Sequence, residues 1–132
     1  MEASKGAPGV LPEDGQPPED RKFRRELSSG ITALALLGIL GGARTPLYGY
    51  SIAKRMEETG EGARIVKHGT LYPVLRSLEA AGLLDSTVEP SVAGPPRRYY
   101  GITDAGRAAL ERWRGIWMET AAFMDGLIGG RG

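Results

Sequence analysis

The hydrophobic spacing of the chain changes from a helical to an extended pattern at Leu83, and this change limits the fold more than any other feature. Before it, apolar residues recur every three or four positions in three short segments, as in amphipathic helices. After it, the segments from Leu83 to Glu89 and from Arg97 to Thr103 read as two β-strands joined by a loop rich in proline and glycine. Three helices followed directly by a β-hairpin predict a winged helix-turn-helix, mainly α with a small β-hairpin.

Helical spacing also predicts where each helix lies. The first is expected to start at a cap formed by Ser28 or Ser29 and to end at Gly41 and Gly42. The second is expected from about Leu47 to Glu58, and the third from about His68 to Ala81. Their apolar faces are expected to comprise Ile31, Leu34, Leu36, Leu37, Ile39, Leu40, Tyr48, Ile52, Met56, Leu71, Val74, Leu75 and Leu78.

The two ends of the chain differ from this central part. Residues 1–22 are acidic, contain four prolines and have little to bury, so they are expected to form a disordered tail. A last helix, capped at Thr103 with Asp104, is expected to run to about Ile128. The chain of 132 residues therefore divides into a tail (1–22), a winged-helix domain (23–103) and a C-terminal helix (104–132).

Composition narrows the classes of function. His68 is the single histidine and cysteine is absent, so neither a disulfide framework nor a familiar zinc site is expected, and no cofactor is implied. An enzyme is not expected, because no carboxylate pair or nucleophile motif accompanies that histidine. The longest apolar run, Ile31 to Leu40, is too short for a membrane span, and no signal peptide is visible. A cytoplasmic protein is expected, without a membrane partner.

The charges point to a nucleic-acid partner. Five acids and one lysine lie in residues 1–20, which leaves sixteen basic and eleven acidic residues in the rest of the chain. The third helix can enter a DNA major groove, and the loop next to Arg97 and Arg98 can hold those residues against the flanking backbone. The predicted DNA contacts are Lys67, His68, Thr70, Tyr72, Arg76, Ser77, Arg97 and Arg98. Taken singly, such residues are more often solvated surface residues, and the prediction depends on their occurring together on one small fold.

Three segments give the chain a resemblance to a known family. They read TPLYGYSIAKRMEE, GTLYPVLRSLEAAGLL and GPPRRYYGITDAGRAAL, in that order. In their order and approximate spacing they resemble the PadR-like transcriptional regulators, over about Phe23 to Ile128. The resemblance implies a DNA-binding repressor that dimerises through its last helix. An activator, or a winged-helix module that binds protein and not DNA, remains an alternative.

The last helix carries a broad apolar face that one small core cannot cover. Its members include Leu110, Trp113, Ile116, Trp117, Phe123, Met124, Leu127 and Ile128. This face predicts a homodimer, which would set two recognition helices about 34–36 Å apart on a pseudo-palindromic operator. The resemblance further implies a small planar aromatic effector at the dimer interface, stacked on Trp117 and Trp113. Packing of both tryptophans in the dimer seam without a ligand is the other interpretation.

Overall fold

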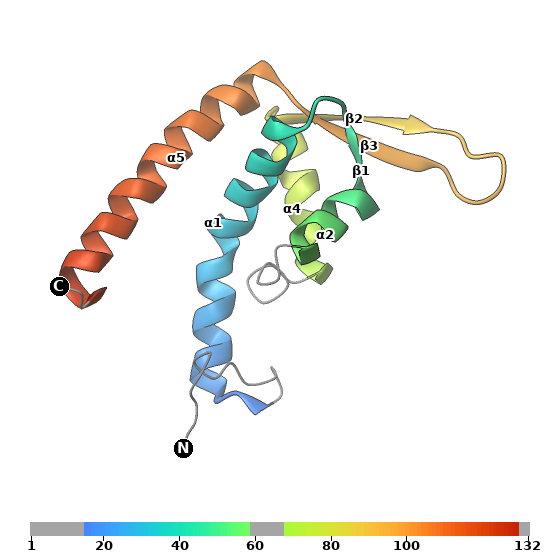
Figure 1. Ribbon diagram of the computed structural model, residues 1–132. Coiled ribbons are helices and arrows are strands. Elements are labelled where there is room, and N and C mark those ends of the chain that lie inside the picture. Colours follow the sequence, from blue (N-terminus) through green and yellow to red (C-terminus); the bar gives the residue numbers. More distant parts are fainter. Residues whose placement is uncertain (1–14, 59–67, 130–132) are drawn as a thin grey trace.

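A computed structural model describes residues 15–58 and 68–129 of the chain (Figure 1). Its helices are α1 (Pro18–Gly42), α2 (Gly49–Glu58), α4 (His68–Ala80) and α5 (Asp104–Met124), the last continuing into a π-helical turn, η2 (Asp125–Gly129). Its strands are β1 (Leu47–Tyr48), β2 (Leu84–Glu89) and β3 (Arg97–Ile102). The expected order of helices, hairpin and final helix is therefore confirmed. No described helix is long and apolar enough to cross a membrane.

The first helix begins earlier than the sequence indicated. It starts at Pro18, ten residues before the expected cap, and Ser28 instead donates from its Oγ to the carbonyl of Arg25 within the helix. Proline suits the first helical position because a backbone N–H there would have no partner within the helix, so its absence costs nothing. The negative charges of Glu19 and Asp20 are stabilised by the positive end of the helix dipole. Residues 18–22 are thus helical and not part of a disordered tail, while 1–14 lie outside the described residues.

The sheet contains a strand that helical spacing concealed. Leu47 and Tyr48, expected as the start of the second helix, instead pair with Tyr100 and Tyr99 of β3. β3 is the central strand, antiparallel to β1 on one side and to β2 on the other. The hydrophobic spacing around Leu47 could not reveal this strand, because its partner lies about fifty residues further along the chain. The pairing fixes the start of α2 against the base of the hairpin.

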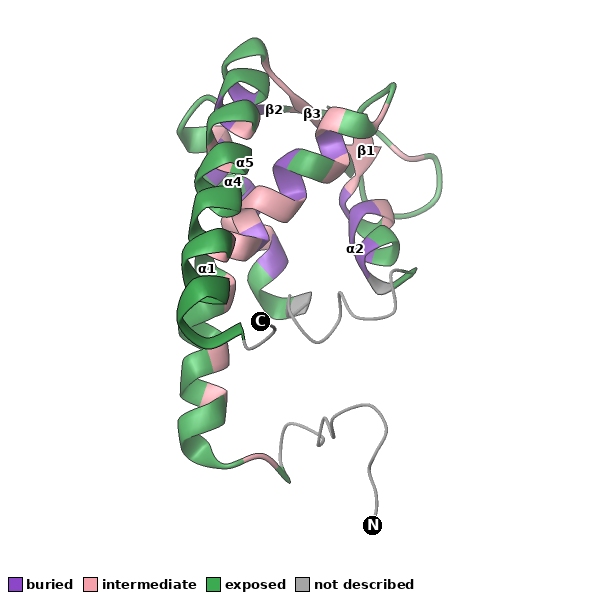
Figure 2. Cartoon of the chain, turned by 60° about the vertical axis from the view of Figure 1, so that its left-hand side comes forward, coloured by how far each residue is buried: buried purple, intermediate pink, exposed green. Residues whose placement is uncertain are grey.

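The core lies where α1, α2 and α4 meet the sheet and the start of α5 (Figure 2). Leu36, Leu37 and Leu40 are buried as expected, but Thr32 is buried with them, whereas Ile31 and Leu34 are only partly buried. The inward face of α1 is therefore rotated from the expected one. The buried apolar residues are Leu36, Leu37, Leu40, Ile52, Ala53, Met56, Leu71, Leu75, Leu78, Leu84, Tyr100 and Ala109.

A tight joint connects α4, the hairpin and α5. Gly82 ends α4 with a φ of 81°, and the Leu83 N–H donates back to the Leu78 carbonyl, as in a Schellman motif. Thr103 caps α5, as the sequence predicted, by accepting from the Gly106 N–H. The Thr103 hydroxyl also donates to the Gly82 carbonyl at 2.8 Å. The joint sets the direction in which α5 leaves the winged-helix part of the molecule.

Candidate nucleic-acid interface

One face of α4 packs into the core, and the other is open. Leu71, Leu75 and Leu78 are buried, in agreement with the expected apolar face. Of the residues predicted to contact DNA, Thr70, Arg76 and Ser77 lie on the exposed side of the helix. Lys67 lies outside the described residues, as does the side chain of His68, the first residue of α4.

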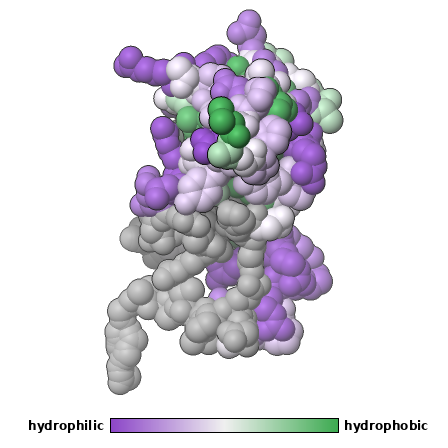
Figure 3. Space-filling view, turned by 90° about the vertical axis from the view of Figure 1, so that its right-hand side faces the viewer, coloured by the Kyte–Doolittle hydropathy of each residue, from purple (hydrophilic) through white to green (hydrophobic). Residues whose placement is uncertain are grey.

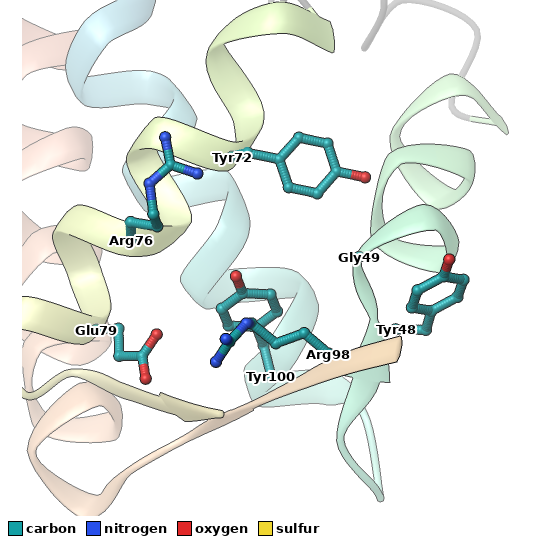
Figure 4. Close-up of a pocket in the computed structure, with 7 residues that line it drawn as sticks. All are labelled: Tyr48, Gly49, Tyr72, Arg76, Glu79, Arg98 and Tyr100. Atoms are coloured by element: carbon teal, nitrogen blue, oxygen red, sulfur yellow. The ribbon is translucent and has the colours of Figure 1, made fainter. Parts of the chain in front are cut away.

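Tyr72 occupies a position that differs from the rest of this set. Its side chain is only partly exposed and packs against the core. Figure 4 shows its ring directed from α4 towards α2. A Cβ atom on Gly49 would lie 2.9 Å from the Tyr72 Cε1 atom, so the glycine makes room for the ring. Tyr72 therefore sets the spacing of the two helices, a role that the helical wheel alone did not indicate.

The hairpin separates the two arginines that the sequence placed together. Successive residues of a strand point to opposite faces of the sheet, so Arg97 and Arg98 project to different sides. The guanidinium carbon of Arg97 lies 5.0 Å from the centre of the Tyr48 ring. Both arginines are exposed, as predicted, but they leave the strand on opposite faces.

Arg98 is turned towards α4 by a chain of hydrogen bonds. Its Nη1 donates to the Ser86 Oγ at 2.9 Å, and the Ser86 Oγ donates to the Glu79 Oε2 at 2.7 Å. Strands β2 and β3 and helix α4 are thus connected through side chains. Sequence reasoning missed Glu79 and Ser86, because only the register of the hairpin brings them together.

A pocket of about 480 Å³ opens between α2, α4 and the sheet (Figure 4). Tyr72, Arg76 and Arg98 are the predicted DNA contacts that it brings together, and Tyr48, Gly49, Glu79 and Tyr100 complete its lining. Burial raises the pKa of the Tyr100 hydroxyl, an effect opposed by the positive charges of Arg98 and Arg76 and reinforced by Glu79. The pocket therefore brings charged groups of α4 and of the hairpin close to the same tyrosine hydroxyl.

The outer surface on the wing side suits a polar partner. Figure 3 views the molecule with this side towards the reader, and its described part is mostly hydrophilic or neutral with small hydrophobic spots. Among the described residues, no group of three or more histidine, cysteine, aspartate or glutamate side chains could hold a metal ion. What the pocket offers a ligand is arginine, hydroxyl and aromatic groups.

A second, apolar feature lies between α1 and α5. There a groove of about 440 Å³ is lined by Leu27, Gly30, Ile31, Ala33, Leu34, Trp113, Ile116, Trp117 and Thr120. Trp113 is partly buried against the core, whereas Trp117 keeps 47% of its surface exposed. The structure thus brings the two predicted effector residues together, on different elements from the predicted DNA contacts.

Comparison with known proteins agrees with this geometry. A family model described as the transcriptional regulator PadR-like family matches residues 36–112. The transcriptional regulator Rv3488 of Mycobacterium tuberculosis is 52% identical over 56 residues, which cover 42% of this chain and 51% of that protein. A PadR family transcriptional regulator from Eggerthella lenta is similar in structure, with a TM-score of 0.69, 30% identity, and coverage of 86% of this chain and 95% of that one.

A PadR-like transcriptional regulator from Bacillus cereus superimposes with a TM-score of 0.63 at 27% identity, over 80% of this chain and 99% of that one. The family match extends from the end of α1 through the helix-turn-helix and the wing into the first half of α5. It therefore includes every described element that lines the pocket between α4 and the hairpin. The chain belongs to the PadR-like family of transcriptional regulators.

Proposed function

We propose that this protein is a homodimeric repressor that works in the cytoplasm and binds a pseudo-palindromic operator in duplex DNA. The observation that carries the proposal is the placement of Arg76 and Arg98, from α4 and from the wing, around one pocket. A recognition helix and a wing that present cations to the same side can bind a groove and its flanking phosphates together.

The recognition helix would read the major groove, which is about 12 Å wide and admits an α-helix. Thr70, Arg76 and Ser77 face outward and can reach base edges or phosphates. His68 is the first residue of α4, where the helix dipole favours a phosphate, and Lys67 precedes it in the sequence. In this proposal Tyr72 contributes from the pocket side, with its ring packed on Gly49.

The wing would contact the DNA beside that groove. Because Arg97 and Arg98 point to opposite faces of the hairpin, each would neutralise a different phosphate. A β-ribbon placed at the minor groove has one DNA strand on each side, so this arrangement suits a wing that lies between two phosphate chains.

The second half of α5 supports the dimer. Together with η2 it exposes Ile116, Trp117, Met118, Phe123, Leu127 and Ile128. A large apolar side chain left in water forgoes roughly 1.5–3 kcal/mol of burial, so a second copy of the chain would gain by covering this face.

The groove between α1 and α5 is the proposed effector site. Its volume of about 440 Å³ lies within the range of small-molecule pockets, and Trp117 offers a flat, half-exposed surface for stacking. A planar aromatic molecule bound there would release the operator by changing the separation of the two recognition helices. Trp113 and Trp117 are the only tryptophans, so titrating a panel of planar aromatics while following fluorescence tests this site. Unchanged fluorescence across the panel would assign both residues to packing alone.

DNA binding is tested by selecting duplexes from a random-sequence pool and measuring the affinity of the best one across a range of salt concentrations. Arg76→Ala is expected to weaken binding and to reduce the slope of log affinity against log salt by about one. Arg112→Ala, which removes an exposed arginine from α5, is the matched control and should leave the slope unchanged. Failure to select any duplex, or equal effects of the two variants, would contradict the proposed function.

A further inference from the structure

The side-chain connection between Glu79, Ser86 and Arg98 extends beyond the residues expected to touch DNA. It starts on α4, one turn after Arg76, and ends on the central strand of the wing. Between them stands Ser86 of β2, whose backbone pairs with Tyr100 and not with Arg98. The bond from Arg98 to Ser86 is thus additional to the ladder of the hairpin.

The hydroxyl of Ser86 both donates and accepts a hydrogen bond. It has one hydrogen, which it donates to the Glu79 carboxylate, while its oxygen accepts from Arg98. Both bonds involve a charged partner, and a hydroxyl that donates to a carboxylate becomes a better acceptor for a guanidinium. Ser86 therefore links an anion on α4 to a cation on β3.

This link leaves Arg98 able to bind something else. A guanidinium carries five N–H donors, and Ser86 takes one of them. Figure 4 shows the Arg98 side chain lying across the pocket beside Tyr100, with Glu79 and Arg76 on the opposite wall. The remaining donors are held on the same side of the molecule as the exposed face of α4.

We propose that Ser86 and Glu79 are positioning residues for DNA binding, which hold the Arg98 guanidinium in register with Arg76 before the DNA arrives. This inference rests on the proposed function, because it assigns a purpose to Arg98 at the DNA surface. Its physical basis is that an arginine ordered in advance loses less rotamer freedom when it meets a phosphate.

The test is Ser86→Ala, measured on the duplex that the wild-type protein selects. This change removes both bonds without changing the net charge, and it is expected to weaken binding roughly fivefold. The salt slope should stay as in the wild type, because Arg98 still reaches its phosphate once bound. Ser86→Thr keeps a hydroxyl and should restore the affinity. Thr87→Ala removes a hydroxyl from the other face of the same strand and should have no effect.

A double variant separates positioning from a general loss of stability. In an Arg98→Ala background, Ser86→Ala should cause no further loss of affinity, because the residue that it positions is gone. An equal loss in both backgrounds, or wild-type affinity for Ser86→Ala alongside weakened binding by Arg98→Ala, would overturn the inference and leave the proposed function standing. If the wild-type protein selects no duplex, the proposed function itself fails.

Discussion

Among the glycines of the described residues, Gly106 has the least room for a side chain. A Cβ atom there would lie 2.1 Å from the Leu83 carbonyl oxygen and 2.7 Å from a side-chain carbon of Ile102. The start of α5 cannot move away from the turn after α4 easily, because the Thr103 hydroxyl donates to the Gly82 carbonyl and accepts from the Gly106 N–H. The glycine thus allows α5 to begin directly against the base of the wing.

Gly106→Ala should consequently lower the free energy of unfolding by about 3 kcal/mol, the upper part of the usual range for overpacking. Urea unfolding followed by circular dichroism measures this loss. The control is Gly38→Ala on α1, where no atom lies within 4 Å of the added Cβ and the helix should gain about 1 kcal/mol. Equal unfolding midpoints for the two variants would show that the Leu83 contact does not constrain α5.

Single residues show what the sequence could and could not predict. The buried positions of α4 follow its helical period, and Thr103 was recognisable as a cap from its type and its place before Asp104. The role of Gly49 was not recognisable, because it depends on a tyrosine 23 residues away that crosses from another helix. Glu79 and Ser86 were missed for the same reason. The hydrogen-bond partner of a polar residue in a hairpin can be predicted only when the register of the two strands is known.

At the scale of elements, the errors came from judging each segment by local burial alone. The segment before Phe23 offers little to a core, so it was expected to be disordered, yet its Pro18, Glu19 and Asp20 are typical of a helix start. Leu47 and Tyr48 fit a helical stripe as well as a strand, and only the distant β3 decides between them. The alternation of Arg97 and Arg98, by contrast, follows directly from the predicted strand.

That alternation makes a prediction about the wing. If Arg97 and Arg98 bind different phosphates, each alanine variant should reduce the salt slope by about one, and the double variant by about two. Their losses in binding free energy should also add, because the two side chains lie on opposite faces and contact different residues, Tyr48 for Arg97 and Ser86 for Arg98. Binding assays of the three variants across a salt series measure both quantities. A double variant no weaker than one of the singles would place both arginines at one phosphate.

At the scale of the whole molecule, the two proposed surfaces lie on separate elements. The polar surface comprises α4 and the hairpin, whereas the apolar one follows the first half of α1 and the second half of α5, which diverge from the core (Figure 1). On α1 it includes Phe23 and Leu27, and on the C-terminal side it includes Phe123 and Leu127. The direction of α5, set by Gly106 and Thr103, would therefore fix the separation of the DNA-binding surfaces in a dimer.

A dimer built on this face should depend on the apolar side chains that it exposes. Phe123 and Leu127 keep 65% and 63% of their surface exposed, so replacing both with glutamate costs the subunit little but places two charges in the proposed interface. Light scattering should give a dimer for the wild type and a folded monomer for the double variant.

The same variant should bind the selected duplex at least about a hundredfold more weakly, because two linked half-site contacts gain that much over one. Val92→Glu, at a fully exposed apolar position in the wing loop, is the control for oligomeric state and should remain dimeric. A double variant that stays dimeric would move the interface elsewhere. One that becomes monomeric but keeps its affinity would separate dimerisation from DNA binding, and α5 would then no longer be the element that sets the spacing of the operator.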